Sequence, residues 1–149
     1  MSNNRTKLND NLTEHMVEYL QIIQEPICRM STASAIFKGF AATIVSGIAA
    51  LSYPDINKWV LVLSFIPVFS FCVLDIYYSH IEKKYRYMYN QVVNKNHSVD
   101  FSMDISSINP KDAKATILDC IKSPSIYLFY PTMVLILICV LIGKFKGAI

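Results

Sequence analysis

Lys38 and Asp75 are the two ionisable residues whose positions could support chemistry within a membrane. Lys38 directly precedes an uncharged run from Gly39 to Pro54, and Asp75 directly follows a second run from Trp59 to Leu74. Counted outward from Ile56 they lie 18 and 19 residues away, so a helical hairpin places them at nearly the same depth. Buried ionisable groups there need a partner or water. The spacing predicts an ion pair that fixes the hairpin or lines a pore entrance; alternatively, Lys38 snorkels and Asp75 caps the bilayer edge.

Hydroxyl and small residues recur at helical spacing in the first uncharged run. Ala42, Ser46 and Ala50 follow one another at intervals of four, with Thr43 and Gly47 one step round the helix. Such stripes let helix backbones approach closely in lipid. The Thr43 and Ser46 hydroxyls could also line a narrow pore. Close helix packing and pore lining therefore both remain open for this face.

Positive charge and aromatic rings are interleaved after the second run. This combination suits an anionic nucleotide, because cations pair with phosphates and rings stack on bases. It equally suits the anionic cytoplasmic leaflet and the excess of Lys and Arg found in cytoplasmic loops. The predicted ligand-binding residues are Lys83, Lys84, Tyr85, Arg86, Tyr89 and Lys95.

Residue patterns typical of catalysis or metal binding are missing from the sequence. The four cysteines have no C-x-x-C spacing, the three histidines are far apart, and no phosphate-binding glycine motif occurs. The sequence therefore predicts no enzyme activity, no cofactor and no metal site.

Three uncharged runs determine which elements position these residues. The run from Ser123 to Gly143 reaches about 32 Å as a helix, enough to cross a hydrocarbon core of about 30 Å. The two earlier runs reach only about 24 Å each and must recruit flanking residues. With 53% apolar and 17% charged residues, the chain is predicted to be an integral membrane protein.

Two polar segments flank these spans. Apolar residues spaced by three and four from Met16 to Met30 predict an amphipathic helix, capped by Asn11 and Glu14 and kinked at Pro26. Alternation from Val99 to Ile105 predicts a strand, whose partner would come from another protomer unless the segment simply packs extended against the helices. Asn109 and Pro110 should open a further helix reaching about Ile121.

The predicted fold is thus an all-α membrane protein with three transmembrane helices, an N-terminal amphipathic helix and a small cytoplasmic segment containing one short strand or hairpin. Its expected divisions are the amphipathic helix at 1–35, a transmembrane hairpin at 36–78, a cytoplasmic segment at 79–123, a third span at 124–143 and a tail at 144–149. Eleven of the 14 basic residues fall in the first and third divisions or at Lys38. This asymmetry predicts a cytoplasmic N-terminus and an external C-terminus.

Several short motifs resemble those of a family of small bacterial membrane proteins. The likeness runs from about Thr13 to the final span and departs at Phe40, where the family carries Trp. The motifs in this chain are Glu18-Tyr19-Leu20, Ile23-Gln24, Arg29-Met30, Lys38-Gly39, Asp75-Ile76-Tyr77-Tyr78 and Asp100-Phe101-Ser102-Met103.

The family resembles the membrane effectors of anti-phage defence, of the Hailong type, that are paired with a nucleotidyltransferase. The resemblance implies a homo-oligomeric ion channel, with a tetramer as the candidate, in the bacterial inner membrane. Its opening would depolarise infected cells under control of a nucleotide or oligonucleotide made by the partner enzyme. A membrane adaptor that anchors a cytoplasmic partner remains the alternative function.

Overall fold

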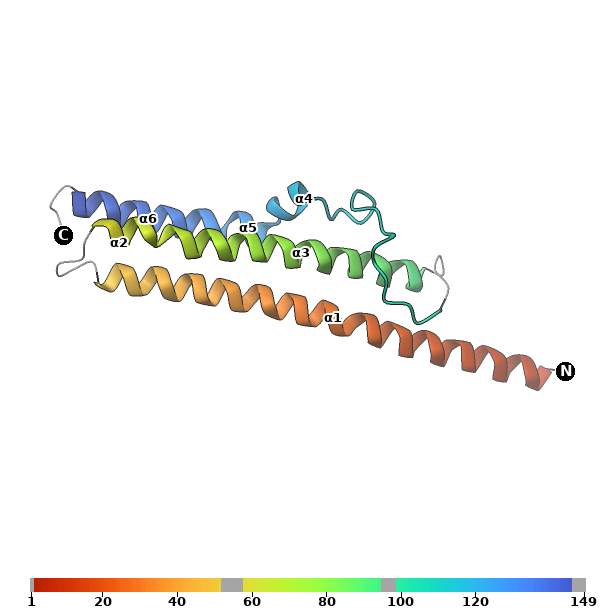
Figure 1. Ribbon diagram of the computed structural model, residues 1–149. Coiled ribbons are helices and arrows are strands. Elements are labelled where there is room, and N and C mark those ends of the chain that lie inside the picture. Colours follow the sequence, from red (N-terminus) through yellow and green to blue (C-terminus); the bar gives the residue numbers. More distant parts are fainter. Residues whose placement is uncertain (1, 52–57, 95–98, 146–149) are drawn as a thin grey trace.

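The computed structural model describes residues 2–51, 58–94 and 99–145, and every regular element in these ranges is a helix. Figure 1 shows the long first helix, the second long helix and a shorter third one running side by side; a small helix and an irregular segment lie along the second long helix, beyond the start of the third. The elements are α1 Ser2–Leu51, α2 Lys58–Leu63, α3 Phe65–Val93, α4 Ile117–Ile121, α5 Pro124–Tyr127 and α6 Phe129–Phe145.

Three helical segments are long and apolar enough to cross a membrane, which confirms the predicted number of spans. They are Thr13–Leu51 in α1, Trp59–Val93 through α2 and α3, and Pro124–Phe145 through α5 and α6. Large apolar side chains such as Phe69 and Leu135 are exposed along their outer faces. A surface of this kind is stable in lipid, so the chain is a membrane-embedded helical protein.

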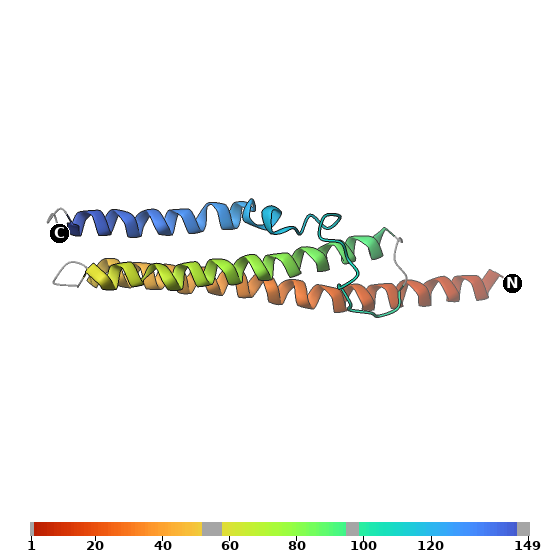
Figure 2. The same cartoon turned by 45° about the horizontal axis from the view of Figure 1, so that its top comes forward.

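The core of the membrane-spanning part lies where α1, α3 and α6 meet. Ala41 and Val45 of α1 pack with Val68 of α3 and with Tyr130 and Leu137 of α6. Figure 2, which turns the molecule by 45°, shows α6 lying beside the pair formed by α1 and α3. The three spans therefore form one small bundle, in which each span contacts the other two.

The helix is not interrupted between the predicted amphipathic stretch and the first span. α1 is a single helix of 50 residues that passes through Pro26. It begins at Ser2, so the cap predicted at Asn11 is wrong: that residue lies inside the helix. The amphipathic stretch and the span are thus one element, and a movement at one end can be carried to the other.

A second, smaller core holds the end of the molecule away from the α1–α2 connection. The first two candidate segments, of 39 and 35 residues, exceed the roughly 20 residues that a bilayer needs, and their charged residues gather at this end. We therefore call this end the extramembrane layer: residues 13–30 of α1, residues 79–93 of α3 and residues 99–122. Tyr19 and Ile23 of α1 are buried there against Met88 and Val92 of α3. Their spacing on each helix gives the apolar face that the sequence predicted from Met16 to Met30.

The strand predicted from Val99 to Ile105 is not present in the described part of the chain. These residues form an irregular segment that packs across α1 and α3, which was the alternative to a strand. The Tyr19 hydroxyl donates to the Ser102 carbonyl at 2.6 Å, and the Phe101 ring lies 5.4 Å from the Tyr19 ring. Phe101 has a φ of 57°, a left-handed conformation that an extended strand cannot accommodate.

The helix predicted from Asn109 is also shorter than expected. Residues 110–114 form turns, and α4 starts only after Thr116, whose hydroxyl accepts from the Asp119 N–H at 3.3 Å. Lys114, with a φ of 47°, interrupts helical geometry just before this cap. Asn109 instead caps a turn, since its side-chain oxygen accepts from the Lys111 N–H.

Three features of the prediction lie outside the described residues. They are the connection between the first two spans (52–57), Lys95, and the tail from residue 146 onward.

Candidate functional site

Lys38 and Asp75 form an ion pair between α1 and α3. The Lys38 Nζ lies 2.6 Å from Asp75 Oδ2, which confirms the pairing predicted from their equal distances to the hairpin turn. Ser34, one helical turn before Lys38, completes the group: its hydroxyl donates to Asp75 Oδ1 at 2.5 Å and accepts from Lys38 Nζ at 2.6 Å. Three polar side chains thus satisfy one another in a closed network.

The network is buried. The Asp75 side chain is 0% exposed and that of Lys38 is 16% exposed. An uncompensated charge in such a place costs several kcal/mol, so each group depends on the other. Sequence reasoning missed Ser34, although its position four residues before Lys38 puts both side chains on the same helical face.

The third span also reaches this network through Tyr130 of α6. Its hydroxyl donates to the Phe71 carbonyl of α3 at 3.2 Å and lies beside the Asp75 carboxylate. Tyr130 is buried, and nothing in the sequence pattern distinguished it from the other aromatic residues of the span. All three spans therefore meet at Asp75.

Exposed aromatic residues indicate how deep this network lies. Trp59 at one end of the second span, and Tyr77 and Tyr127 at the other end of the bundle, have exposed rings of the kind enriched at membrane surfaces. Tyr77 follows Trp59 by 18 positions, which rise about 27 Å as a helix, close to the thickness of a hydrocarbon core. Asp75 precedes Tyr77 by two residues, so it lies just inside this boundary.

Thr43 and Ser46 do not join the charged network. Both side chains are exposed on the face of α1 opposite Ala41 and Val45, which point into the bundle. The Thr43 hydroxyl donates to the Gly39 carbonyl at 2.8 Å, one turn earlier in the same helix. Their role as pore-lining residues stays a prediction.

The predicted ligand residues separate into two groups on different faces of α3. Tyr85 and Tyr89 pack toward α1 in the extramembrane core, and the Tyr85 hydroxyl reaches the Met103 carbonyl at 3.5 Å. Lys83 and Arg86 line an open cavity of about 510 Å³. Lys84 is half-buried and is not part of this cavity's lining. Arg86 also lines a second cavity, of about 350 Å³, together with Tyr89. The predicted residues that the structure describes therefore share no single cavity, although Arg86 and Tyr89 lie together.

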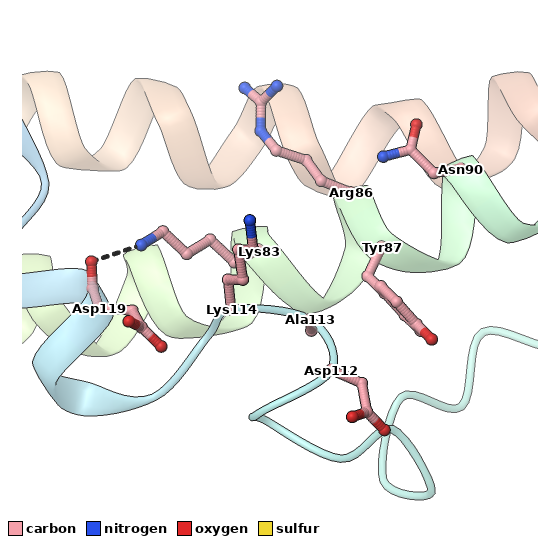
Figure 3. Close-up of a pocket in the computed structure, with 8 residues that line it drawn as sticks. All are labelled: Lys83, Arg86, Tyr87, Asn90, Asp112, Ala113, Lys114 and Asp119. Carbon is pink, nitrogen blue, oxygen red and sulfur yellow. Dashed lines mark hydrogen bonds between the residues drawn. The ribbon is translucent and has the colours of Figure 1, made fainter.

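The cavity carries both signs of charge. Lys83 donates to the Asp119 carbonyl at 2.7 Å, as Figure 3 shows, and Arg86 pairs with Glu82 at 2.7 Å. Tyr87, Asn90, Asp112 and Lys114, which the prediction left out, also line it. A hydrogen bond from the Thr116 hydroxyl, aided by other nearby donors and cations, lowers the pKa of Asp119 and keeps it ionised.

Fold and site together define a class: a three-span helical membrane protein with a buried ion pair at one edge of its bilayer segment. Comparisons with protein-family models, with curated proteins and with solved structures find no match to this chain. Among the described residues, no group of three or more His, Cys, Asp or Glu side chains could hold a metal ion. The argument for function therefore depends on the site itself.

Proposed function

We propose that this protein assembles into a homo-oligomeric ion channel controlled from its extramembrane layer. The Ser34–Lys38–Asp75 network supports this most strongly, because ionisable residues inside a membrane are rare and costly and commonly mark ion pathways. The network also lies on α1, the helix that continues without a break into the extramembrane layer. A change there can reach the charged pair through one rigid element.

Oligomerisation is a necessary part of the proposal. A bundle of three helices has no room for an aqueous path, whereas a ring of copies encloses one. The face of α1 that carries Thr43, Ser46 and Gly47 is exposed in the protomer, and its hydroxyls tolerate water better than the apolar outer faces of α3 and α6. We place this face toward the pore.

The biological setting of the proposal follows from the sequence. The excess of Lys and Arg in the extramembrane layer supports a cytoplasmic position for it. The resemblance of its motifs to membrane effectors of anti-phage defence supports a channel of the bacterial inner membrane in that role. In that role it depolarises infected cells. Control by a nucleotide from a partner nucleotidyltransferase stays a prediction. Two cavities bear on it: Lys83 and Arg86 line one, and Arg86 and Tyr89 line another, while Tyr85 and Tyr89 also pack against the extramembrane core.

Ion flux through liposomes that contain the purified protein tests the channel proposal. We expect wild-type protein to dissipate a preset potential and Thr43→Val to slow this dissipation about tenfold or more, because an apolar side chain in a narrow pore raises the barrier to hydrated ions. Thr132→Val is the matched control: its hydroxyl makes the same bond to the carbonyl four residues back, on an exposed face of α6. Correctly folded wild-type protein that conducts no ions under any ligand or voltage would contradict the proposal.

A membrane adaptor is the second candidate, and the exposed side chains of α4 favour it. Ile117 is 64% exposed and Leu118 is 68% exposed, side by side in the extramembrane layer. Contiguous exposed apolar surface can serve as a contact site for another protein. Under this hypothesis, Ile117→Ser with Leu118→Ser abolishes co-purification of the partner, while the membrane potential is the same with and without expression.

A further inference from the structure

The Lys38 ammonium lies among a small group of oxygen atoms within the membrane. Its Nζ lies 2.6 Å from Asp75 Oδ2 and 2.6 Å from Ser34 Oγ. The Tyr130 hydroxyl lies beside the same carboxylate. Carboxylate, hydroxyl and phenol oxygens are the ligands that hard cations accept in proteins. The ammonium therefore stands where an alkali cation could be bound.

We propose that this is a monovalent-cation site whose resident occupant is the tethered Lys38 ammonium, and that a sodium or potassium ion takes its place when Lys38 withdraws. The inference rests on the proposed channel function and specifies its substrate as small monovalent cations. Lys38 then acts as a built-in competitor: while it holds Asp75 the site is closed, and its departure exposes a carboxylate that attracts cations and repels anions.

The charge of the site selects monovalent ions. Asp75 is the one acidic side chain in the network, and Ser34 and Tyr130 add neutral oxygens. One positive charge balances this set, whereas a divalent ion would leave an excess charge buried, which is costly at this depth. The described residues contain no larger cluster of acidic, His or Cys ligands that could compensate.

The two partners of the ion pair differ in their freedom to move. The Asp75 side chain is 0% exposed and stays fixed between the three spans, while Lys38 is 16% exposed and extends on a flexible stem. Because Asp75 lies just inside the aromatic boundary, Lys38 can swing its ammonium to the headgroup layer without passing through hydrocarbon. Ser34 stays beside Asp75 when the Lys38 side chain swings away, so its hydroxyl remains available to an incoming cation.

Thermal stability of Lys38→Ala in detergent tests the site without reference to conduction. Without the ammonium, Asp75 needs an external cation, so we expect the Tm to rise by about 5 °C for each tenfold increase in sodium or potassium above the dissociation constant. N-methylglucamine chloride at equal ionic strength controls for screening, since this bulky cation cannot enter. Wild-type protein and the Lys38→Ala/Asp75→Asn double variant should not respond to the choice of cation.

The test remains valid even if Lys38→Ala folds poorly, because the recovery of folded protein by sodium or potassium is itself a measurement. If the variant is recovered folded only in sodium or potassium, the site is supported. If it is equally unstable in every salt while the double variant folds, Asp75 cannot bind a small cation and the inference fails. The same conclusion follows if Lys38→Ala is stable and indifferent to the cation.

Conduction separates the failure of this inference from that of the channel proposal. A wild-type channel that conducts anions, or that does not discriminate, overturns the cation site and leaves the channel standing. Cation-dependent stability of Lys38→Ala, together with wild-type protein that never conducts, has the opposite meaning: the site is real and the channel proposal is wrong.

Discussion

At the scale of single residues, the molecule depends on polar groups that satisfy one another in places without water. Asp75 has lost all contact with solvent, yet Lys38 and Ser34 supply both of its oxygens with partners. Tyr19 does the same in the extramembrane layer, where its buried hydroxyl holds the Ser102 carbonyl. Each contact joins residues distant in sequence, so each one can be tested by a substitution that leaves the local helix intact.

Reversing the charges of the buried pair tests its contribution to stability. Lys38→Asp or Asp75→Lys alone puts two like charges together in a buried place and should cost about 3–5 kcal/mol, seen as loss of folded, monodisperse protein. The double reversal restores opposite charges and should recover most of the yield. Glu82 and Arg86 form a partly exposed pair in the same molecule, and reversing either should cost less than about 1 kcal/mol. A double reversal as damaging as the single ones would show that pairing is not what matters.

Tyr19→Phe removes one hydroxyl from the contact between α1 and the irregular segment. We expect destabilisation of about 1 kcal/mol, because the Ser102 carbonyl loses its donor while the aromatic packing remains. Faster hydrogen exchange or proteolysis within residues 99–105 would report it. Tyr127→Phe, at an exposed ring, serves as the control and should have no effect there. Unchanged protection in Tyr19→Phe would mean that Phe101 and its neighbours hold the segment alone.

At the scale of elements, two prolines explain why the second and third spans are each divided. Pro67 and Pro131 have no N–H, and each lies three residues after a break, at Ser64 and at Leu128. At the first of these breaks the Ser64 hydroxyl donates to the Leu61 carbonyl at 2.5 Å. The effect of proline on a helix is local, so both breaks follow from the sequence around them. α1 nevertheless continues through Pro26. The buried residues Ile23 and Met30 pack before and after this proline, so tertiary packing can outweigh the helix-breaking effect of a proline.

Predictions failed where an element depends on contacts between distant residues. Alternation from Val99 to Ile105 predicted a strand, but a strand needs a neighbouring strand, and Tyr19 supplies a competing hydrogen bond instead. Asn109 and Pro110 had the right residue types for a helix start, yet His80 of α3 binds the Ala115 carbonyl at 2.5 Å and fixes that stretch as a turn. Neither contact can be predicted from the local sequence.

Thr116→Ala should loosen α4, because Thr116 provides its N-terminal cap. The loss predicts roughly five-fold faster amide exchange in residues 117–121 at neutral pH, and Thr116→Ser should restore protection. The Thr116 hydroxyl also lowers the pKa of Asp119 in the folded state. This contribution is therefore present above the ordinary Asp pKa and is lost as the pH falls through the lowered value. The difference between wild type and Thr116→Ala should shrink below about pH 4; a difference independent of pH would exclude Asp119 from the cap.

At the scale of the whole molecule, hydropathy was sufficient to predict three spans, because lipid exposure needs no specific partner. Counting residues from the hairpin turn was sufficient to predict the Lys38–Asp75 pair, because helices have a fixed rise. The arrangement of the third span could not be predicted in this way, since Tyr130 looks like any other aromatic residue in an apolar run. The assembly of several copies is even harder to predict from the sequence, because it depends on which outer faces of the bundle contact one another.

Gly47→Leu tests whether the small-residue face of α1 joins copies of the protein. A side chain at Gly47 meets nothing within 4 Å in the protomer, and replacing glycine within a helix favours the helical state by up to about 1 kcal/mol. The protomer should therefore remain stable. If copies pack through this face, however, the added bulk separates their backbones and should convert the oligomer to smaller species in native mass spectrometry. Ser70→Leu is the matched change on an exposed face of α3.

The pattern of the two variants decides which face carries the contact. Dissociation by Gly47→Leu alone places α1 at the subunit interface, and with it Thr43 and Ser46 near the axis of the assembly. Dissociation by Ser70→Leu alone would show that α3 forms the interface. The oligomer would then be confirmed, but the assignment of α1 as the pore-lining helix would be wrong. A wild-type protein that is monomeric in both detergent and lipid nanodiscs would contradict the channel proposal, because the three helices of one copy cannot enclose a water-filled path.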